Sequence, residues 1–269
     1  MPELPEVETT VRAINKFENQ VLKRLVVHNR NLRWKVEKNI ESKFKLQEIK
    51  KISRRAKYII IYFKDFSMMI HLGMSGKLRI QKTKDNYFKK HDHVELIFSN
   101  EKIIFNDPRR FGSLHYAKNY EEHSLIKCLG IEPLSKSFNK KYLKSLCVKS
   151  NLCIKKLIMD QKKIVGVGNI YACESLFIAK INPEKISNTL SINDCERLTK
   201  AIKKILLYAI KEGGTTLKDF YSADGSEGYF NLKLSVYGRN EKLCKKCKSE
   251  IKKVNIGQRA TFYCMNCQT

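Results

Sequence analysis

Acidic residues and long apolar runs are both scarce in this chain of 269 residues. It has 27 aspartates and glutamates against 53 lysines and arginines, which gives a formal net charge of +26. Apolar runs such as YIIIYF at residues 58–63 are far shorter than the ~18 residues that a membrane-spanning helix needs. The N-terminus has neither the basic segment nor the apolar segment of a secretory signal. These absences predict a soluble, cytoplasmic protein with no membrane partner.

The positive charge itself indicates a polyanionic partner. Each phosphate that a cationic side chain neutralises releases counterions, so an excess of this size favours binding to nucleic acid. The alternative is codon bias, because lysine, asparagine and isoleucine are abundant throughout, as in an AT-rich genome. That bias would not favour arginine, so the arginines are the more informative part of the excess.

The chain begins with an amphipathic segment followed by many short strands. Leu4, Val7, Val11 and Ile14 recur at three- and four-residue spacing, as on one face of a helix, and Pro5 suits its first turn. From about residue 21 to residue 116 the pattern changes to β-rich runs such as KYIIIYF, HVELIF and KIIF. These runs predict an antiparallel sandwich or barrel behind a leading helix.

Helical periodicity returns after residue 135. The runs IKKLIMD, NIYACESLFIAK and DCERLTKAIKKILLYAIKEG are predicted helices, and the last should stop at Gly213 and Gly214. The segment YSADGSEGYF, residues 221–230, is predicted to be a loop, and the tail from about residue 236 is small and basic. We therefore expect an α+β, multidomain protein with boundaries at 1–133, 134–235 and 236–269.

The nine cysteines divide into two groups. Five occur singly and are expected to be small buried side chains in a reducing cytosol: Cys128, Cys147, Cys153, Cys173 and Cys195. The other four form two C-x₂-C pairs separated by sixteen residues: Cys244, Cys247, Cys264 and Cys267. This spacing predicts one tetrahedral, structural Zn²⁺ with no position left for a catalytic water, in preference to a pair of disulfides or redox sites.

Two glycines precede a predicted helix in VGVGNIYACESLF. Gly168 leads into Asn169, which we expect to be the N-cap, and a helix N-terminus suits a phosphate group. The other interpretation is a packing junction between two helices.

Two glycine-flanked turns carry apolar side chains at their tips. HLGMSG places Met74 on one turn, and DPRRFG places Arg109, Arg110 and Phe111 on another. Each apolar residue taken singly is more often part of a core. An apolar tip beside arginines is also the device with which base-flipping proteins enter a duplex and replace an extruded base.

The first residues, MPELPEVETT, are acidic on a basic chain. Removal of Met1 would leave Pro2 with a free secondary amine, which can attack a sugar C1′ and form an iminium. Glu3 beside it could move protons, and Glu6 lies one helical turn further on, where it could support the site. The alternative is that acids near a helix N-terminus simply stabilise the helix dipole.

Together these motifs resemble formamidopyrimidine-DNA glycosylases, bacterial base-excision enzymes for oxidised purines such as 8-oxoguanine. The resemblance runs from Met1 to the last cysteine, through MPELPEVET, RRAKY, HLGMSG, KHDHV, NDPRRFG, VGVGNIYACESLF, GGTTLKDF, VYGR and QRATFYC. It implies an N-terminal β-sandwich with a leading helix, a helix–two-turn–helix domain and a C-terminal zinc finger. Damaged double-stranded DNA would be the partner of a monomeric enzyme, and no cofactor beyond zinc is implied.

The resemblance also assigns catalytic roles. It implies that Pro2 is the Schiff-base nucleophile and that Glu3 donates the proton for base removal. Lys57, in RRAKY, is implied in β-elimination and phosphate contact. Arg259, near the expected turn of the finger hairpin, is implied in δ-elimination and phosphate contact.

Further positions match DNA-contacting residues of the family. Met74, Arg109 and Phe111 match the intercalating residues, Asn169 matches a phosphate-binding asparagine, and His91 matches a DNA-contacting histidine. Where relatives often carry a lysine before IKKLIMD, this chain offers three candidates: Lys149, Ser150 and Asn151. The region that closes over the flipped base would include Lys218, Tyr221 and Phe230.

The sequence therefore predicts a bifunctional DNA glycosylase and apurinic/apyrimidinic lyase for oxidised purines. One alternative is the endonuclease VIII branch, which has the same architecture and acts on oxidised pyrimidines. The other is a non-catalytic zinc-finger protein that binds DNA through its basic surface alone.

Overall fold

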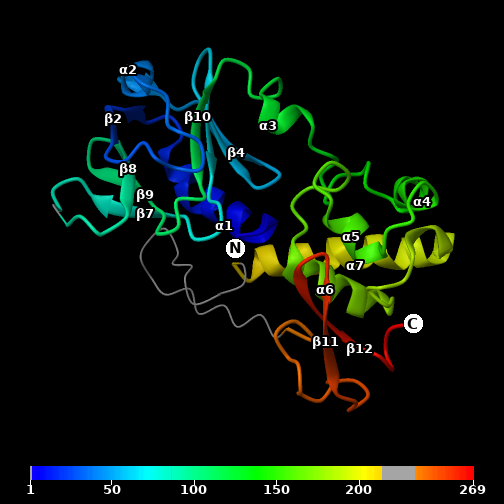
Figure 1. The fold of residues 1–269 in the computed structure, drawn as a ribbon. Helices are drawn as coiled ribbons and strands as arrows, with labels where there is room; N and C mark the ends of the chain where they lie inside the picture. The colour runs from blue at the N-terminus through cyan, green and yellow to red at the C-terminus, as the bar shows by residue number, and fades with distance from the viewer. Residues whose placement is uncertain (1, 86, 214–233) are drawn as a thin grey trace. The chain divides into compact units, whose positions relative to one another are not determined.

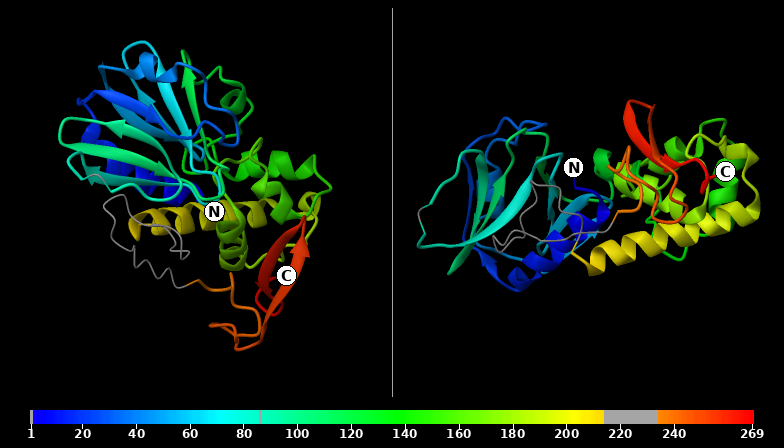
Figure 2. Two further views of the ribbon diagram at one scale, coloured as in Figure 1. Left: turned by 60° about the vertical axis from the view of Figure 1, so that its left-hand side comes forward. Right: turned by 90° about the horizontal axis from the view of Figure 1, so that it is seen from below.

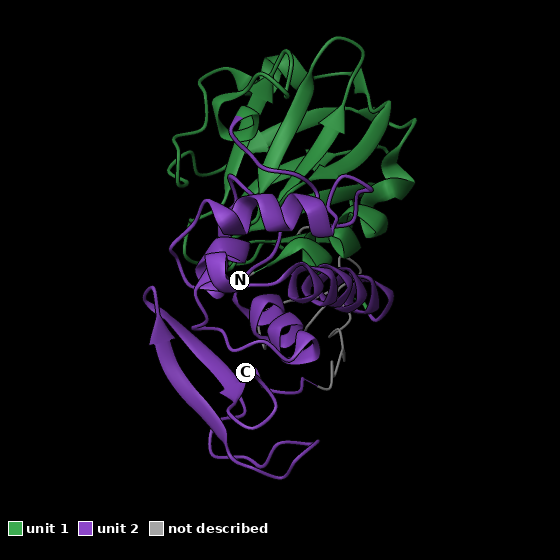
Figure 3. Cartoon of the chain, turned by 90° about the vertical axis from the view of Figure 1, so that its right-hand side faces the viewer, with its two compact units in different colours: residues 1–127, 213–231 green, residues 128–212, 232–269 purple. Residues whose placement is uncertain are grey.

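The computed structural model describes residues 2–85, 87–213 and 234–269. The chain forms two compact units, each with its own hydrophobic core (Figure 3). Of the described residues, the first unit contains those up to Lys127 together with Gly213, and the second contains Cys128–Glu212 together with 234–269.

Helix α1 (Leu4–Ile14) opens the first unit and continues into a 3₁₀ turn, η1 (Asn15–Phe17). Pro5 lies in its first turn, as predicted, where a missing N–H costs little because these groups have no partner within the helix. The apolar stripe that includes Val7 and Val11 is buried. This stripe packs α1 against strands β4 and β5.

The strands of the first unit form two four-stranded antiparallel sheets and one short pair (Figures 1 and 2). One sheet has the order β10-β6-β5-β4, the other has the order β2-β8-β9-β7, and β1 pairs with β3. The strand bounds are β1 (Val21–Leu22), β2 (Arg24–Val27), β3 (Gln47–Glu48), β4 (Lys51–Arg55), β5 (Tyr58–Tyr62), β6 (Ser67–His71), β7 (Lys77–Lys82), β8 (Asp92–Ile97), β9 (Glu101–Asn106) and β10 (Ser113–Ala117). The described part of the unit also contains two short helices, α2 (Ile40–Phe44) and α3 (Ser124–Lys127).

Both sheets contribute side chains to one core, together with α1. Ile61 and Ile70 come from one sheet, Leu96 and Phe105 come from the other, and each is at most 1% exposed. The predicted sandwich with a leading helix is therefore confirmed. The sandwich places the β6–β7 and β9–β10 turns, which carry Met74 and the two arginines, at strand ends, as expected.

The second unit is helical and ends in a β-hairpin. Its elements are α4 (Lys140–Val148), α5 (Ile154–Met159), α6 (Asn169–Ala179), η2 (Ser187–Thr189), α7 (Ile192–Lys211), β11 (Ile251–Ile256) and β12 (Arg259–Cys264). Helix α6 packs against both α7 and β12, which joins the helices to the hairpin. Helix α7 stops just before Gly213, whose φ of 82° is left-handed, as the glycine at this position predicted.

One expectation about helix α6 was wrong. The N-cap is Gly168, with extended backbone angles, and Asn169 is the first helical residue. The Asn169 side chain is engaged elsewhere, as described below. Among the described residues, no helix is long and apolar enough to cross a membrane.

Candidate functional site

The N-terminal residues of the first unit hold two buried carboxylates. Pro2 is buried, and Glu3 and Glu6 are only 2% and 3% exposed. The backbone N–H of Glu3 donates to Glu6 Oε2 at 2.8 Å, and the Glu6 N–H donates to the Glu3 carboxylate. This reciprocal pair offsets the cost of burying the acids and satisfies N–H groups at the helix start. It fixes the Glu3 side chain next to Pro2.

Arg54 connects helix α1 with the turn that carries Lys57. Arg54 Nε lies 3.1 Å from Glu8 Oε2 on α1, and Arg54 Nη1 donates to the Ala56 carbonyl at 2.8 Å. Ala56, which has a left-handed φ of 53°, and Lys57 form the two-residue connection between β4 and β5. Two elements that carry predicted catalytic residues are thus joined through one guanidinium group.

Burial, which is the largest cause, and the positive charges of Lys57 and Arg33 together lower the pKa of His71 to about 4. The ring is therefore neutral at physiological pH, and its Nδ1 accepts a hydrogen bond from the Gly73 N–H at 3.0 Å. Lys57 thus lies beside a neutral histidine, which adds no further positive charge there.

A buried aspartate holds the two apolar turns together. Asp107 is fully buried and accepts hydrogen bonds from Ser75 Oγ at 2.6 Å and from the Gly112 N–H at 2.7 Å. The Arg109 N–H donates to the same serine hydroxyl at 3.1 Å. Carboxylate hydrogen bonds of this kind are stronger than neutral ones, so the β6–β7 and β9–β10 turns behave as one structure.

Glycine permits the close approach of these turns. A Cβ on Gly73, whose φ is 66°, would lie 2.4 Å from the Phe111 carbonyl carbon. Met74, Arg109 and Phe111 consequently line one surface groove, to which Arg33 also contributes. The Arg109 guanidinium lies over the Phe111 ring at 4.8 Å, and the ring is 40% exposed. The structure brings together the three residues that we predict to enter the DNA duplex, Met74, Arg109 and Phe111, and we call them the wedge residues. Their entry into DNA stays a prediction.

His91 lies at the same end of the β2-β8-β9-β7 sheet. Its carbonyl accepts from the Asp107 N–H at 3.1 Å, and its left-handed φ of 74° is unusual for a residue other than glycine. The register between β8 and β9 shifts at His93, whose Nε2 lies 2.8 Å from the Asp107 carbonyl oxygen. The bulge therefore attaches His91 to the aspartate that supports the wedge residues.

The start of helix α6 holds a buried cation. Lys155, from α5, is 1% exposed, and its Nζ donates to Asn169 Oδ1 and to Thr261 Oγ1, each at 2.6 Å. Asn169 Nδ2 donates to the Ala260 carbonyl at 2.8 Å. Asn169 therefore ties the α6 N-terminus to strand β12, and a positive charge lies directly beside it.

Glu174, further along α6, fixes the segment that precedes the four paired cysteines and their β-hairpin. It is 2% exposed, and its carboxylate accepts from the N–H groups of Ser235, Val236 and Tyr237 at 2.8–3.0 Å. A buried carboxylate that receives several backbone hydrogen bonds holds its partners firmly. Helix α6 therefore holds both the segment before the hairpin, through Glu174, and strand β12, through Asn169.

The three residues before helix α5 that are candidates for a DNA contact differ in their exposure to solvent. Lys149 and Asn151 are exposed, whereas Ser150 is 7% exposed and its Oγ accepts from the Leu152 N–H at 3.3 Å. Asn151 Oδ1 accepts from Asn188 Nδ2 at 2.8 Å. Exposure favours Lys149 and Asn151 over Ser150 as surface contacts.

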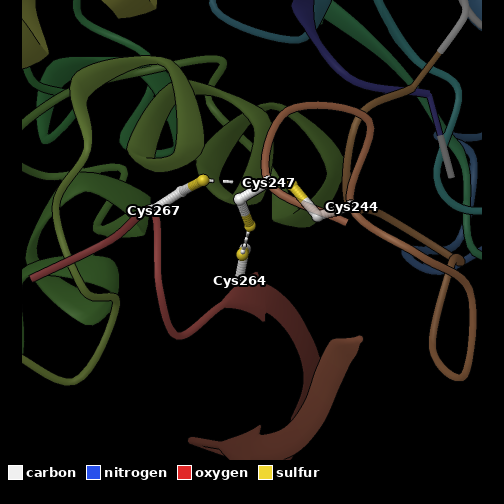
Figure 4. Close-up of side chains that lie close together, drawn as sticks. All are labelled: Cys244, Cys247, Cys264 and Cys267. Atoms are coloured by element: carbon white, nitrogen blue, oxygen red, sulfur yellow. Dashed lines mark hydrogen bonds between the residues drawn. The ribbon is translucent and has the colours of Figure 1, made fainter. Parts of the chain in front are cut away.

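The four paired cysteines converge on one centre (Figure 4). Their sulfur atoms all lie within 4.8 Å of one another, and Figure 4 shows them pointing toward a common space. The Cys247–Cys264 and Cys244–Cys267 sulfur distances are 3.4 and 3.9 Å. Four thiolates about 2.3 Å from a tetrahedral Zn²⁺ require similar separations, so this donor set fits one structural zinc ion.

The remaining predicted residues fall on the hairpin and on an undescribed segment. Arg259 is exposed and is the first residue of β12, beside the turn, as expected. Lys218, Tyr221 and Phe230 lie outside the described residues.

Sequence reasoning missed three buried charged residues that organise these parts: Asp107, Lys155 and Glu174. Each lies inside a motif that had been identified, namely NDPRRFG, IKKLIMD and NIYACESLF. The available signal was an ionisable side chain at a position that the surrounding apolar pattern would bury.

Comparison with known proteins matches three family models in order. The formamidopyrimidine-DNA glycosylase N-terminal domain matches residues 1–114 and the H2TH domain of the same family matches residues 129–221. The zinc finger found in FPG and IleRS matches residues 241–269. With the sandwich, the helical unit and the four-cysteine centre, these matches define a zinc-finger DNA glycosylase of base excision repair with apurinic/apyrimidinic lyase activity.

Full-length relatives agree with the domain matches. The chain is 48% identical to the formamidopyrimidine-DNA glycosylase of Ruthia magnifica and 47% identical to that of Escherichia coli strain 55989, in each case over the whole of both chains. It superimposes on a Lactococcus lactis FPG mutant complexed with Fapy-dG-containing DNA with a TM-score of 0.91 and 34% identity, covering 99% of each chain. For the MutM (FPG) protein of Thermus thermophilus the TM-score is 0.88 and the identity 31%, covering 99% and 98%. The chain belongs to the formamidopyrimidine-DNA glycosylase family.

Proposed function

We propose that this enzyme excises oxidised purines, such as 8-oxoguanine and formamidopyrimidines, from duplex DNA and then cleaves the strand through a Schiff base on Pro2. The observation that carries the proposal is the buried Pro2–Glu3 pair, which Glu8 and Arg54 connect with the Lys57 turn. The Pro2 amine, the proton donor Glu3 and the cation of Lys57 thus belong to segments that are connected with one another.

The first step is base displacement. With Met1 removed, the lone pair of the Pro2 nitrogen attacks C1′, the C1′–base bond breaks, and the base leaves with the proton that the Pro2 nitrogen gives up. Glu3 then donates a proton to the ring oxygen, so that the bond between this oxygen and C1′ breaks, the sugar ring opens and an iminium forms between C1′ and Pro2. An α-amino group has a reference pKa of about 7.7–8.0, so part of it is already neutral. The nearby positive end of α1 disfavours further protonation and keeps the amine nucleophilic.

Strand cleavage follows from the iminium. Loss of a 2′ proton expels the 3′ phosphate, and a second elimination expels the 5′ phosphate, which leaves a gap of one nucleoside flanked by phosphates. We assign Lys57 to the first elimination and Arg259 to the second. Glu6 supports this reaction by holding the Glu3 backbone in place.

The other residues hold the distorted duplex. Met74 and Phe111 enter the stack, and Arg109 occupies the space that the extruded base leaves. Asn169 binds a phosphate at the α6 N-terminus, where Lys155 adds positive charge. His91, together with Lys149 or Asn151, binds backbone phosphates. Zinc folds the finger that presents Arg259 and takes no part in the chemistry.

The remaining assignments rest on the sequence. We place Lys218, Tyr221 and Phe230 in the region that closes over the flipped base, and we keep the division into domains at 1–133, 134–235 and 236–269. We propose that the enzyme acts as a monomer on cytoplasmic, nucleoid-associated DNA.

Complexes of a solved relative support the substrate class. The Lactococcus lactis protein has been captured with Fapy-dG-containing DNA, with abasic-site DNA and with DNA containing an oxidised pyrimidine. The last complex supports oxidised pyrimidines as a second class of substrate.

Two measurements test the proposal. Single-turnover excision from duplexes carrying 8-oxoguanine or thymine glycol should favour 8-oxoguanine, and a clear preference for thymine glycol would move the enzyme to the endonuclease VIII type. Borohydride should trap a covalent enzyme–DNA adduct during turnover. Tight binding without an adduct on any lesion would instead indicate a binding protein.

A further inference from the structure

Two adjacent aromatic side chains of the first unit are strongly exposed. Tyr87 and Phe88, between β7 and β8, are 63% and 52% exposed, more than the 40% of the predicted wedge residue Phe111. They are followed by the exposed Lys89 and Lys90. Large apolar side chains that lie together at a surface often mark a binding site.

Residues 87–90 are attached to the end of the sheet that supports the wedge residues. The Lys89 N–H donates to Asp92 Oδ2 at 2.8 Å, and the Lys90 carbonyl accepts from Asn106 Nδ2 at 3.0 Å. Asn106 also donates to Asp92 Oδ1 at 2.8 Å and directly precedes Asp107, which holds the wedge turns. Hydrogen bonds to Asn106, the peptide bond to Asp107 and the hydrogen bonds of Asp107 therefore connect residues 89–90 to the wedge turns.

The charge of this surface suits a polyanion. Asp92 is 2% exposed and lies 2.6 Å from the Arg79 guanidinium, so its negative charge is neutralised within the protein. Lys89 Nζ lies 5.4 Å from the Tyr87 ring, which places a cation beside an exposed aromatic surface. In the described part of the β7–β8 connection, Asp85 is the only acid.

The Phe88 ring is held in place although it is exposed. Its edge packs against the His28 ring, with the centroids 4.9 Å apart and the planes at 73°. A ring that is already fixed loses little conformational freedom when a ligand covers it. Exposed aromatic rings next to cations are typical of surfaces that bind distorted or single-stranded nucleic acid.

We propose that residues 87–90 form a second DNA contact beside the wedge. Lys89 and Lys90 bind backbone phosphates, and the rings of Tyr87 and Phe88 pack on sugar and base faces that the wedge exposes by unstacking the duplex. This proposal rests on the proposed function, because the wedge must distort the DNA first.

Binding to a duplex that carries a reduced, uncleavable abasic site tests the proposal, measured by fluorescence anisotropy over a range of salt concentrations with the zinc-loaded protein. Lys89→Ala/Lys90→Ala should flatten the dependence of log K on log[salt] by about 1.8, since each lost phosphate contact removes about 0.9. Tyr87→Ala/Phe88→Ala should weaken binding at least about fivefold with an unchanged slope, as expected when aromatic contacts to bases are lost.

The control is Lys45→Ala/Leu46→Ala, which removes an exposed lysine and an exposed apolar side chain from another loop of the same unit. This variant should bind like the wild type. If the control loses as much affinity as the two test variants, or if the test variants bind like the wild type, the second contact does not exist. Unchanged DNA affinity of the two test variants is also the result expected if these residues bound a protein partner instead.

Failure of the proposed function gives a different result. The wild-type enzyme must form a borohydride adduct with the cleavable abasic duplex. Absence of that adduct contradicts the proposed function regardless of the anisotropy data. An adduct formed by wild type, together with unaltered affinity of both test variants, contradicts only the second contact.

Discussion

Helices α1 and α6 both begin at residues that we assign to the reaction, yet the charges buried at the two starts are opposite. At α1 the carboxylates of Glu3 and Glu6 are buried, and they satisfy backbone N–H groups of the helix. At α6 the buried group is the Lys155 ammonium, which is bonded to Asn169. A phosphate at α1 would meet two carboxylates, whereas a phosphate at α6 would meet a cation.

This difference assigns separate tasks to two similar structures. A helix N-terminus by itself favours any anion, so the helix dipole cannot distinguish the two sites. The side chains do so: acids next to an amine suit proton transfer, and an amide next to a cation suits phosphate binding. Changes at α1 should therefore affect the chemical step, and changes at α6 should affect binding.

The largest expected effect is at α1. Glu3→Gln should slow base excision by roughly 10²–10⁴-fold, the usual contribution of a general acid, with little change in affinity. The substituted amide can still accept the Glu6 N–H, so the helix start is preserved. Single-turnover excision of 8-oxoguanine measures this effect. The control, Glu6→Gln, should retain more activity than Glu3→Gln, and the reverse order would show that the roles have been assigned to the wrong acids.

The next effect concerns the hairpin that α6 holds. Cys247→Ser should abolish zinc binding, which contributes on the order of 10 kcal/mol to the folding of such modules, and should lower affinity for an abasic duplex at least tenfold. Metal content and anisotropy measure both changes. Cys128→Ser is the control, because this cysteine belongs to the same unit, lies outside the zinc centre and is exposed, contrary to the expectation that it would be buried. Normal zinc content in Cys247→Ser would contradict the four-thiolate site.

A smaller effect is expected from the buried cation. Lys155→Met leaves Asn169 Oδ1 and Thr261 Oγ1 without this donor, so unfolding free energy should fall by about 2 kcal/mol and DNA affinity by about tenfold. Lys156→Met changes the exposed neighbour and is the matched control. Urea unfolding and anisotropy measure the two quantities. Unchanged affinity in a folded Lys155→Met variant would remove the contrast between the two helix starts.

The smallest effect is a pH dependence confined to the first unit, which contains all six histidines. Burial, together with nearby positive charge, lowers the pKa of His71 and of His115 to about 4, below the 6.5 of an unfolded histidine. The unfolded chain therefore binds more protons between these values, and stability falls as the pH is lowered from 6.5 toward 4.

Urea unfolding at pH 7 and pH 5 measures this dependence. The loss of stability between these values should be smaller in His115→Asn than in the wild type. An equal loss in both proteins would show that His115 does not contribute to it.

Local patterns in the sequence predicted the fold well. The spacing of Val7 and Val11 predicted α1, and the cysteine pairs predicted a single four-thiolate centre, because both depend on residues close together in the chain. The turns that carry Met74 and Arg109 were also located correctly, since glycine and proline mark turns directly.

The sequence could not predict which partners come from distant segments. Asn169 looked like an N-cap, but Gly168 takes that position, and the asparagine binds Ala260, which lies 91 residues away. Lys155 and Lys156 are consecutive, yet only the first is buried, because its partners lie on α6 and β12. Such choices depend on tertiary packing, which no local pattern encodes.

The central claim is that the N-terminal amine of Pro2 is the nucleophile, and the site of the trapped adduct tests it most directly. The enzyme is reduced with borohydride during turnover of an 8-oxoguanine duplex, digested, and analysed by mass spectrometry of the DNA-linked peptide. We predict that Met1 is absent and that the sugar remnant is on the nitrogen of Pro2. An adduct on Lys57 or another lysine, or an active enzyme that retains Met1, would contradict the claim.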